Sequence, residues 1–343
     1  MGPHQFGTRT THGAAQRQEP WQHGGAGVMW HHAIRQGSRR FTALLCLVCC
    51  LCCCSCQGVV TRSAIRTFGT VMDAGQPAYA RETDLTLAEP ALATTVKLLE
   101  ALLESDPNNP TLLLQAAQGL CSYTYAFVES QIETARGHNP HQAAWQTERA
   151  QRLYRRGLQY SWQRLRLFNP AWDQGPQLEL AVLTPLLRQL DATAVPALFW
   201  TAFCWGNLLN LSRTELETVA ALPRLAALVT RLVELDDTYF YGAPHLLQAV
   251  QYASRSSLLG GDPARAQQHF RQAYAISQGR LLLIPLLEAQ YYAVQVQDRA
   301  LFSTRLEEIL QAPETLFPEQ GFLNTVARQR AALLLRRIDE LFP

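Results

Sequence analysis

The chain has 343 residues, of which 48% are hydrophobic and 17% charged, and its formal net charge is +2. This length allows one large domain or two ordinary ones, and the apolar content is enough for a sizeable core. Residues 1–56 contain five arginines and one glutamate, so the rest of the chain has 25 basic and 27 acidic side chains. Such a nearly neutral body gives no electrostatic basis for binding nucleic acid, which usually requires a basic face.

Seven of the nine cysteines lie in one short window, from Cys46 to Cys56, within and after an apolar run that begins at Phe41. A basic stretch at residues 35–40 comes directly before this run. A basic segment followed by about 7–15 apolar residues is typical of a secretory signal and is too short to span a membrane. A zinc site would instead need Cys or His pairs from two separate places. We therefore interpret residues 29–56 as a lipoprotein signal peptide.

The end of this segment resembles a relaxed bacterial lipobox. Ser55 precedes Cys56, and a polar Gln57-Gly58 follows it, so we expect Cys56 to carry the lipid, with Cys54 as the next candidate. Several acyl chains per molecule anchor a protein stably, whereas a single chain binds only marginally. The segment therefore predicts a lipid-anchored protein on the periplasmic side of a bacterial membrane.

The remaining boundaries follow from composition. Residues 1–28 are rich in Gly, His and Gln without an apolar period, so we interpret them as a misassigned start ahead of Met29. Residues 57–85 are expected to be a linker with a first short helix. Residues 86–343 are expected to form a single helical domain.

No sustained apolar–polar alternation occurs after residue 86, so strands are not expected. Prolines and capping residues instead mark a series of helices. We expect helices from Pro90 to Ser105, from Thr111 to Ala135, from Pro140 to Asn169, and near 177–190 and 196–211. The last of these is apolar nearly all round and must therefore be buried. Ser212 and Glu215 have the spacing of a capping box and predict the start of the next helix.

The clearest helical unit covers residues 260–273. Two glycines end one helix there, Asp262 can cap the next, and Pro263 can take its first position. A small–large–small pattern then follows on one helical face: Ala266, Phe270 and Ala273. This pattern is typical of the second helix of a tetratricopeptide unit. We therefore predict an all-α fold of stacked, TPR-like helix hairpins with degenerate repeats.

The chain also resembles a known family, the T component (TatT family) of TPR-associated TRAP transporters. The resemblance covers roughly residues 59–343 and rests on the order and spacing of six short motifs. These are Tyr125–Glu129, Ala150-x3-Tyr154-x2-Gly157, Trp205-Gly206, Glu234–His245, Gly260–Ala273 and Asp298–Phe302. The chain departs from the family pattern at residues 248–250, Gln-Ala-Val, where a glycine in close helix packing is expected.

The resemblance implies a cryptic TPR fold and a homotrimer with an apolar channel or groove. It also implies a partner, the periplasmic solute-binding (P) subunit of the same transporter, and a hydrophobic or amphipathic small ligand. An alternative of a different class is a TPR-like structural lipoprotein that scaffolds cell-envelope assembly by binding peptides. A third is a hydrolase or lyase on a helical toroid, with Glu129 as its acid or base.

The mature chain contains no Gly-x-Ser-x-Gly elbow, phosphate-binding glycine loop or His-Glu-x-x-His motif. We therefore expect no enzyme activity, no metal site and no cofactor. Cys121 and Cys204 lie in apolar segments and could form a disulfide, but we favour two buried thiols.

Polar and aromatic residues that interrupt apolar faces are the candidates for a ligand site or channel, because pockets combine an apolar lining with few polar groups. These candidates are Tyr125, Glu129, Trp200, Trp205, Asn207, Tyr239, Tyr241, His245 and Tyr252. The alternative for each one is a hydrogen-bonded residue of the core.

Overall fold

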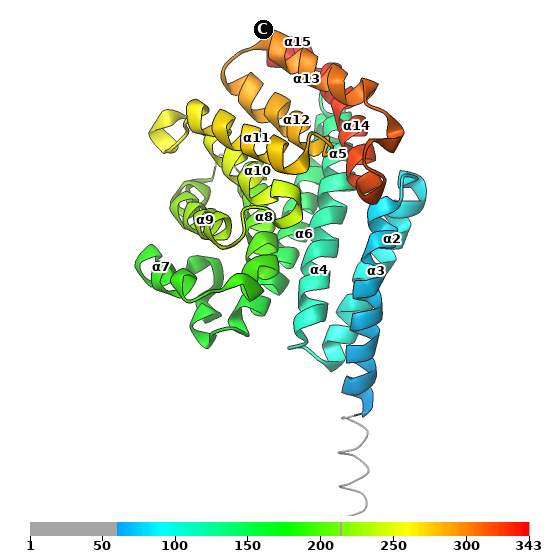
Figure 1. Cartoon of the computed structure of the whole chain (residues 1–343), viewed down its shortest axis with the longest axis vertical. Coiled ribbons are helices and arrows are strands. Elements are labelled where there is room, and N and C mark those ends of the chain that lie inside the picture. The colour runs from blue at the N-terminus through cyan, green and yellow to red at the C-terminus, as the bar shows by residue number, and fades with distance from the viewer. Residues whose placement is uncertain (1–59, 213–214, 343) are drawn as a thin grey trace, which may run out of the picture. The chain divides into compact units, whose positions relative to one another are not determined.

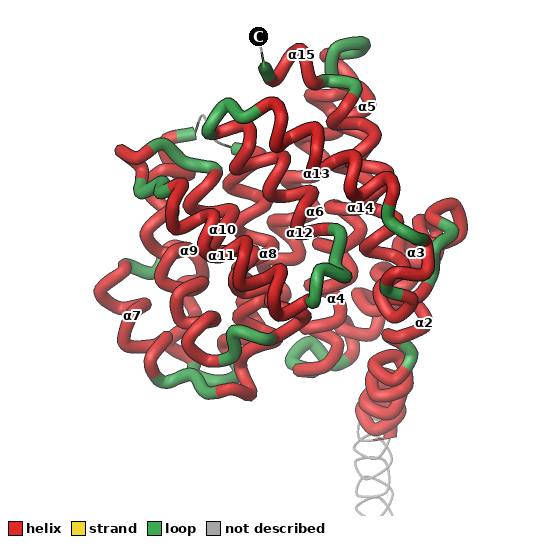
Figure 2. Tube along the Cα trace, turned by 45° about the horizontal axis from the view of Figure 1, so that its top comes forward, coloured by secondary structure: helices red, strands yellow, loops and turns green. Residues whose placement is uncertain are grey.

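A computed structural model describes residues 60–212 and 215–342 of the chain. The expected start segment 1–28 and the signal segment 29–56, with Cys54 and Cys56, lie outside these ranges. The chain divides into two compact units, Met1–Val60 and Thr61–Pro343, and all that follows concerns the second. Every element in the described ranges is a helix and none is a strand, which confirms the all-α prediction (Figure 2).

The first half of this unit begins with helical residues 61–74. It continues with α2 (Gln76–Arg81), α3 (Leu85–Ser105), α4 (Pro110–Tyr123), the π-helix η1 (Thr124–Val128), α5 (Glu129–Ala135) and α6 (Pro140–Arg166). The 3-10 helix η2 (Pro170–Gln177), α7 (Leu180–Arg188), η3 (Ala192–Ala194), α8 (Val195–Leu211) and α9 (Leu216–Leu235) follow.

The second half contains shorter helices (Figure 1). They are α10 (Tyr239–Ala253), η4 (Ser257–Leu259), α11 (Pro263–Ser277), α12 (Leu283–Leu287), the π-helix η5 (Glu288–Ala293), α13 (Arg299–Gln311), η6 (Glu314–Leu316), η7 (Pro318–Gln320), α14 (Gly321–Leu335) and α15 (Ile338–Leu341). The last long helix, α14, packs against α2, α3 and α5, so the two ends of this unit lie side by side (Figure 1).

Two helix starts differ from the sequence-based expectation. The helix expected from Pro90 begins at Leu85, because the Asp84 carboxylate accepts hydrogen bonds from the backbone N–H groups of the first turn. The helix after residue 211 begins at Leu216, with Glu215 at its N-cap and no side-chain cap. Ser212 does not cap it, since the Ser212 hydroxyl accepts a hydrogen bond from Gln151 at 3.0 Å.

The compact unit begins earlier than the expected domain boundary at residue 86. Ile65 is buried in one hydrophobic cluster with Leu99 and Leu103. The backbone carbonyl of Gly69 accepts a hydrogen bond of 3.1 Å from the buried side chain of Gln115. The helix at residues 61–74 is therefore packed against the rest of the domain.

Helix α8 lies in the larger hydrophobic cluster, which also includes residues of α4, α6, α7 and α9. Ala192–Leu211 is long and apolar enough to cross a membrane by length and composition alone. Most of its side chains are buried, including Leu198 and Cys204 at 0% exposure, as predicted for a helix that is apolar nearly all round. A core helix of a folded domain has the same composition.

The prediction of two free thiols is wrong, because Cys121 of α4 and Cys204 of α8 form a disulfide. Their Cα atoms are 5.7 Å apart, within the usual range for a disulfide. Gly157 of α6 faces the pair, and a Cβ there would lie 2.4 Å from the Cys121 sulfur. The glycine therefore allows three helices to meet at the disulfide.

The predicted unit at residues 260–273 forms as expected. The Asp262 side chain accepts a hydrogen bond from the Arg265 N–H and caps α11, with Pro263 as its first residue. The small–large–small face is buried in the second large cluster, where Phe270 is only 1% exposed. Helices α10 and α11 pack against one another as a hairpin (Figure 1). TPR-type stacking of the hairpins stays a prediction.

Replacing Phe270 with Ala should lower the free energy of unfolding by about 3–5 kcal/mol, because the ring leaves a cavity that its neighbours cannot fill. Chemical denaturation followed by circular dichroism measures this loss. Leu258→Ala is the matched control, since Leu258 is 97% exposed, and it should change stability by less than about 0.5 kcal/mol. A loss below about 1 kcal/mol for Phe270→Ala would contradict its place in the core.

Candidate functional site

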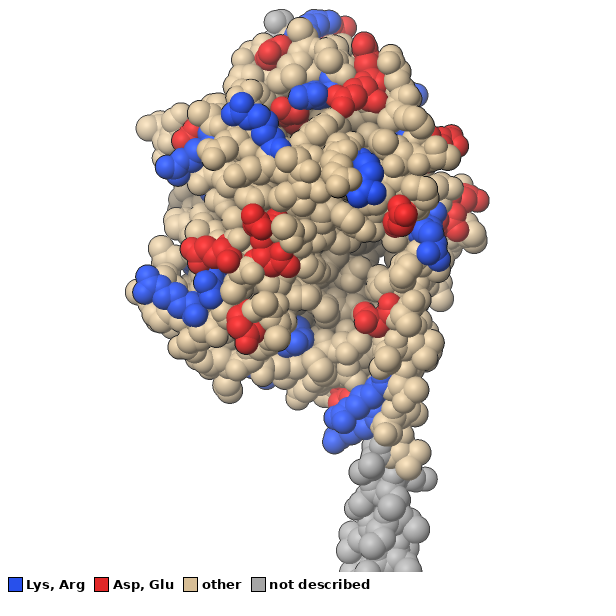
Figure 3. Space-filling view, in the orientation of Figure 1, with Lys and Arg blue, Asp and Glu red and all other residues tan. Residues whose placement is uncertain are grey.

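A large cavity of about 820 Å³ opens among the described helices. Residues of α2, α3 and α4 line it on one side, and residues of α8, α9 and α10 line it on the other. Residues near α12 and η7 complete its wall. Figure 3 shows a hollow between the α3 side and the α9–α10 side, with few charged atoms inside it.

Aromatic side chains of α8 form the centre of the wall. Trp200 and Phe203 line the cavity and meet edge to face, with ring centroids 5.5 Å apart. The ring of Tyr125 approaches Phe203 in the same manner at 5.8 Å. Aromatic pairs in this geometry are favourable beyond the area that they bury. The centre of the wall is therefore a packed group of aromatic rings.

Two π-helices, η1 and η5, each contribute residues to the cavity wall. Tyr125 and Ala126 come from η1, and Tyr291 comes from η5. In η1 and beside it, the hydroxyls of Thr124 and Ser130 donate hydrogen bonds of 2.7 Å to backbone carbonyls four residues earlier. A π-turn is rare and frequently occurs at functional sites. Both π-helices of the described chain lie at the cavity wall.

A left-handed turn at the start of α10 supplies a further part of the wall. Phe240, Tyr241 and Gly242 have φ values of 45°, 61° and 84°. Left-handed backbone costs of the order of 1–3 kcal/mol for a non-glycine residue and often marks a functional site. A Cβ on Gly242 would also lie 3.2 Å from the Cα of Ala273. The positive φ and the close approach of Ala273 therefore both favour glycine at this position. The turn places Phe240 and Tyr241 at the cavity.

Four of the nine residues predicted from the sequence line the cavity, and five do not. Those that line it are Tyr125, Trp200, Asn207 and Tyr241. Those outside its lining are Glu129, Trp205, Tyr239, His245 and Tyr252. The second group belongs to packed or hydrogen-bonded parts of the core.

Trp205 is buried at 3% exposure on the face of α8 turned away from the cavity. Its ring meets Trp162 of α6 edge to face at 5.7 Å. The Trp162 indole N–H in turn donates a hydrogen bond of 2.8 Å to the carbonyl of Trp172. These indoles therefore join α8 to α6 and η2.

His245, Tyr252 and His269 form a polar cluster between α10 and α11. The Nδ1 atoms of the two histidines are 2.9 Å apart, and the Tyr252 ring stacks on His269. Burial, together with His245 and Arg265, lowers the pKa of His269 to about 4.

Tyr239 lies at the other end of α10, where burial and then Asp236 raise its pKa to about 12. The two histidines and Tyr252 thus lie between α10 and α11, whereas the Tyr239 ring packs against Phe199 of α8 at 5.3 Å, and none of the four lines the cavity.

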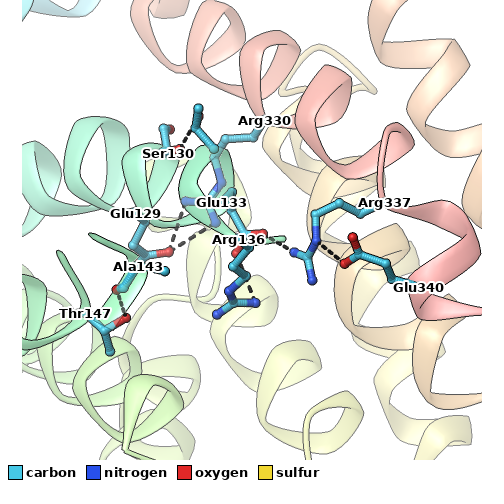
Figure 4. Close-up of polar contacts among 10 residues, drawn as sticks. Glu129, Ser130, Glu133, Arg136, Ala143, Thr147, Arg330, Arg337 and Glu340 are labelled. Atoms are coloured by element: carbon cyan, nitrogen blue, oxygen red, sulfur yellow. Dashed lines mark hydrogen bonds and ion pairs between the residues drawn. The ribbon is translucent and has the colours of Figure 1, made fainter. Parts of the chain in front are cut away.

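Glu129 lies in a buried ion pair with Arg330 of α14 (Figure 4). The two guanidinium N–H groups each donate to one carboxylate oxygen at 3.1 Å, and Tyr154 donates to the other. Burial alone would lower the pKa of Arg330, but Tyr125 and Glu129 outweigh it and raise that pKa. Burial and then Glu129 also raise the pKa of Tyr154. The third hypothesis, an enzyme with Glu129 as its acid or base, gains no support from this paired and buried carboxylate.

The sequence did not single out several residues of the cavity. Phe203, Gln251 and Arg255 line it. Phe203 lies in the helix expected at residues 196–211. That helix is apolar nearly all round, so its sequence does not show which side faces a cavity. Gln251 and Arg255 follow a region of family-like motifs, and no local pattern distinguishes them from ordinary helix-end residues.

The lining of the cavity is mostly apolar. The described residues contain no group of three or more His, Cys, Asp or Glu side chains that could hold a metal ion. The cavity is closed in by aromatic and aliphatic side chains with a few polar groups, the usual composition of a small-molecule site.

Comparison with known families agrees with this architecture. The model of a family described as the TRAP transporter T-component matches residues 81–342. The chain belongs to this family. No curated protein matches the chain in sequence. This T-component is therefore an accessory component of a TRAP transporter, a membrane-associated bacterial system, and its family is not one of enzymes.

Removing one partner of the buried ion pair should strongly destabilise this T-component. Arg330→Met leaves the Glu129 carboxylate buried without its cation, which typically costs about 3–5 kcal/mol of unfolding free energy. The double variant Glu129→Leu, Arg330→Met should recover much of that loss, because no unpaired charge remains. Arg299→Met is the control, since its ion pair with Asp339 is exposed and worth at most about 1 kcal/mol. If Arg330→Met and Arg299→Met lost equal amounts of unfolding free energy, the Glu129–Arg330 pair would not be a buried, desolvated pair.

Proposed function

We propose that this T-component is a lipid-anchored, periplasm-facing subunit whose cavity binds a hydrophobic or amphipathic small ligand. We propose also that it contacts the solute-binding (P) subunit of the same transporter. The observation that supports ligand binding is the aromatic-lined cavity of about 820 Å³. Small-molecule sites typically have volumes of about 300–1,000 Å³ and a mostly apolar lining.

The alternative, a structural lipoprotein that binds peptides, would need a concave groove lined with polar and basic side chains. The aromatic residues Phe199, Trp200 and Phe203 instead line the cavity. Among its charged lining residues are only Arg81, Arg255 and Glu319. This lining favours the ligand hypothesis over the scaffold hypothesis.

Filling the cavity should abolish ligand binding without unfolding the protein. Gly206 lines the cavity, and a Cβ there would meet nothing closer than Leu225 at 3.7 Å. Gly206→Phe should therefore weaken binding of a fluorescent apolar probe by about tenfold or more, since a buried aromatic ring occupies the same space. Ala264→Phe, on the exposed side of α11, is the control and should bind as the wild type does. Unchanged probe affinity in a folded Gly206→Phe variant would contradict the proposal.

The partner is proposed to dock over the mouth of the cavity. Val219 and Leu259 line the cavity and are themselves exposed. Leu216 and Leu258 flank them in the chain, with 85% and 97% of their surfaces exposed. Exposed large apolar side chains beside a cavity often mark an interaction surface.

Charged residues at these positions should weaken the contact with the P subunit. We expect Leu216→Asp, Leu258→Asp to reduce co-migration with the solute-binding protein of the same transporter on size-exclusion chromatography by about tenfold in apparent affinity. Leu310→Asp, an exposed leucine of α13 outside the cavity, is the control and should co-migrate normally. Partner binding that persists in the double variant would place the contact elsewhere.

Anchoring is proposed to occur through Cys56 or Cys54, which lie outside the described residues. The double variant Cys54→Ser, Cys56→Ser should move from the detergent phase to the aqueous phase of a detergent partition, because it has no acyl chains. A variant that stays in the detergent phase would exclude lipid anchoring at these cysteines. Light scattering of the same lipid-free protein would test the proposed homotrimer.

A further inference from the structure

The cavity has one polar end, close to the C-terminus of α10. Gln251, Ser254, Arg255 and Ser256 all line the cavity there. The stretch from 251 to 259 contains no acidic residue. The rest of the wall near α8 is aromatic, so the cavity combines an apolar interior with a polar, cationic end.

Arg255 has no anionic partner among the described residues. Its side chain is half-buried, and the ion pairs of the described chain do not include it. Burial lowers the pKa of its guanidinium to about 10, which leaves it charged at neutral pH but poorly solvated. Its backbone carbonyl, by contrast, is satisfied by a hydrogen bond of 2.6 Å from Gln295.

Gln251 provides an independent observation at the same end. Its side chain is 7% exposed, and it makes no hydrogen bond to another described residue. Buried polar side chains are nearly always hydrogen-bonded, so the Gln251 amide, which lines the cavity, is free to bond a ligand there. The amide supplies two N–H donors.

The other charged lining residues do not compensate Arg255. Arg81 belongs to α2 and Glu319 to η7, and these two segments pack against one another. Both segments are distinct from the end of α10. Two arginines and one glutamate line the cavity, so its charged lining has a net positive charge.

We propose that Gln251 and Arg255 bind the anionic head group of a single-tailed amphiphile, whose apolar tail extends between the aromatic residues of α8. This inference rests on the proposed ligand-binding function and adds to it a charge preference, an orientation and two specificity residues. Hydrogen bonds between a guanidinium and an anion are about twice as strong as neutral ones, and a planar guanidinium can bind a carboxylate with two of them.

The test uses three probes with the same tail and different head groups: decanoate, decan-1-ol and decylammonium. Calorimetric titration of the lipid-free chain (Cys54→Ser, Cys56→Ser), below the aggregation concentration of each probe, gives the three dissociation constants. We expect decanoate to bind about tenfold or more tightly than decan-1-ol, and decylammonium to bind most weakly.

Arg255→Gln should remove the preference, bringing decanoate and decan-1-ol within about twofold of each other while decan-1-ol binds as before. Arg255→Lys keeps the charge and should retain part of the preference. Gln251→Leu should weaken decanoate binding and leave decan-1-ol unaffected. Arg265→Gln is the matched control, because Arg265 lies outside the cavity and is paired with Asp262.

Two outcomes would overturn the inference and are distinguishable. If decanoate and decan-1-ol bind the wild type equally, or if Arg255→Gln retains the full preference, the cavity binds apolar ligands but Arg255 does not select their charge. If none of the three probes binds, the proposed ligand-binding function itself fails, and this inference fails with it.

Discussion

The buried ion pair between Glu129 and Arg330 is the contact on which the closure of the domain depends. The two residues are 201 positions apart, and Arg330 also donates to the carbonyl of Tyr125, a residue of the cavity wall. A charge pair without water is costly unless both partners are fully hydrogen-bonded, and Tyr154 supplies a further donor here. Next to it, Glu133 lies between Arg136 and Arg337 (Figure 4). The Glu129–Arg330 pair joins α5 to α14, and the Glu133–Arg337 pair joins α5 to the residues just after α14, so the two hold the second half of the domain to the first.

The shape of the cavity depends on backbone that departs from ideal helix. Two π-helices and a left-handed turn each place aromatic residues at its wall. Regular helices that pack closely leave little space between them, since protein interiors are as dense as organic crystals. The π-helices and the left-handed turn interrupt this regular packing beside the cavity. At η1, the hydroxyls of Thr124 and Ser130 donate hydrogen bonds to the backbone carbonyls of Leu120 and Ala126. An empty volume of this size is thus compatible with a well-packed domain.

Much of the fold could be predicted from local chemistry. Proline and Asn or Asp caps identified α4, α6 and α11 closely, and uninterrupted apolarity identified α8 as a core helix. The site was only partly predictable, because periodicity shows that a residue is buried and not what it faces. Trp200 and Trp205 illustrate this: they share one apolar helix, yet the first lines the cavity and the second packs on α6. The disulfide was missed for a similar reason, since the space at Gly157 that permits it is a property of three helices.

The position of α14 has a consequence for the order in which the domain can form. The N-terminal helices α2 and α3 bury part of their surface against α14, the last long helix of the chain. Contacts between residues so far apart in sequence form late, because a long loop must close before they become favourable. Because a ribosome synthesises the chain from its N-terminus, its early helices stay incompletely covered until the final residues arrive. The lining of the cavity then remains open to water, and to any chaperone that binds apolar surface, until the two ends of the domain meet.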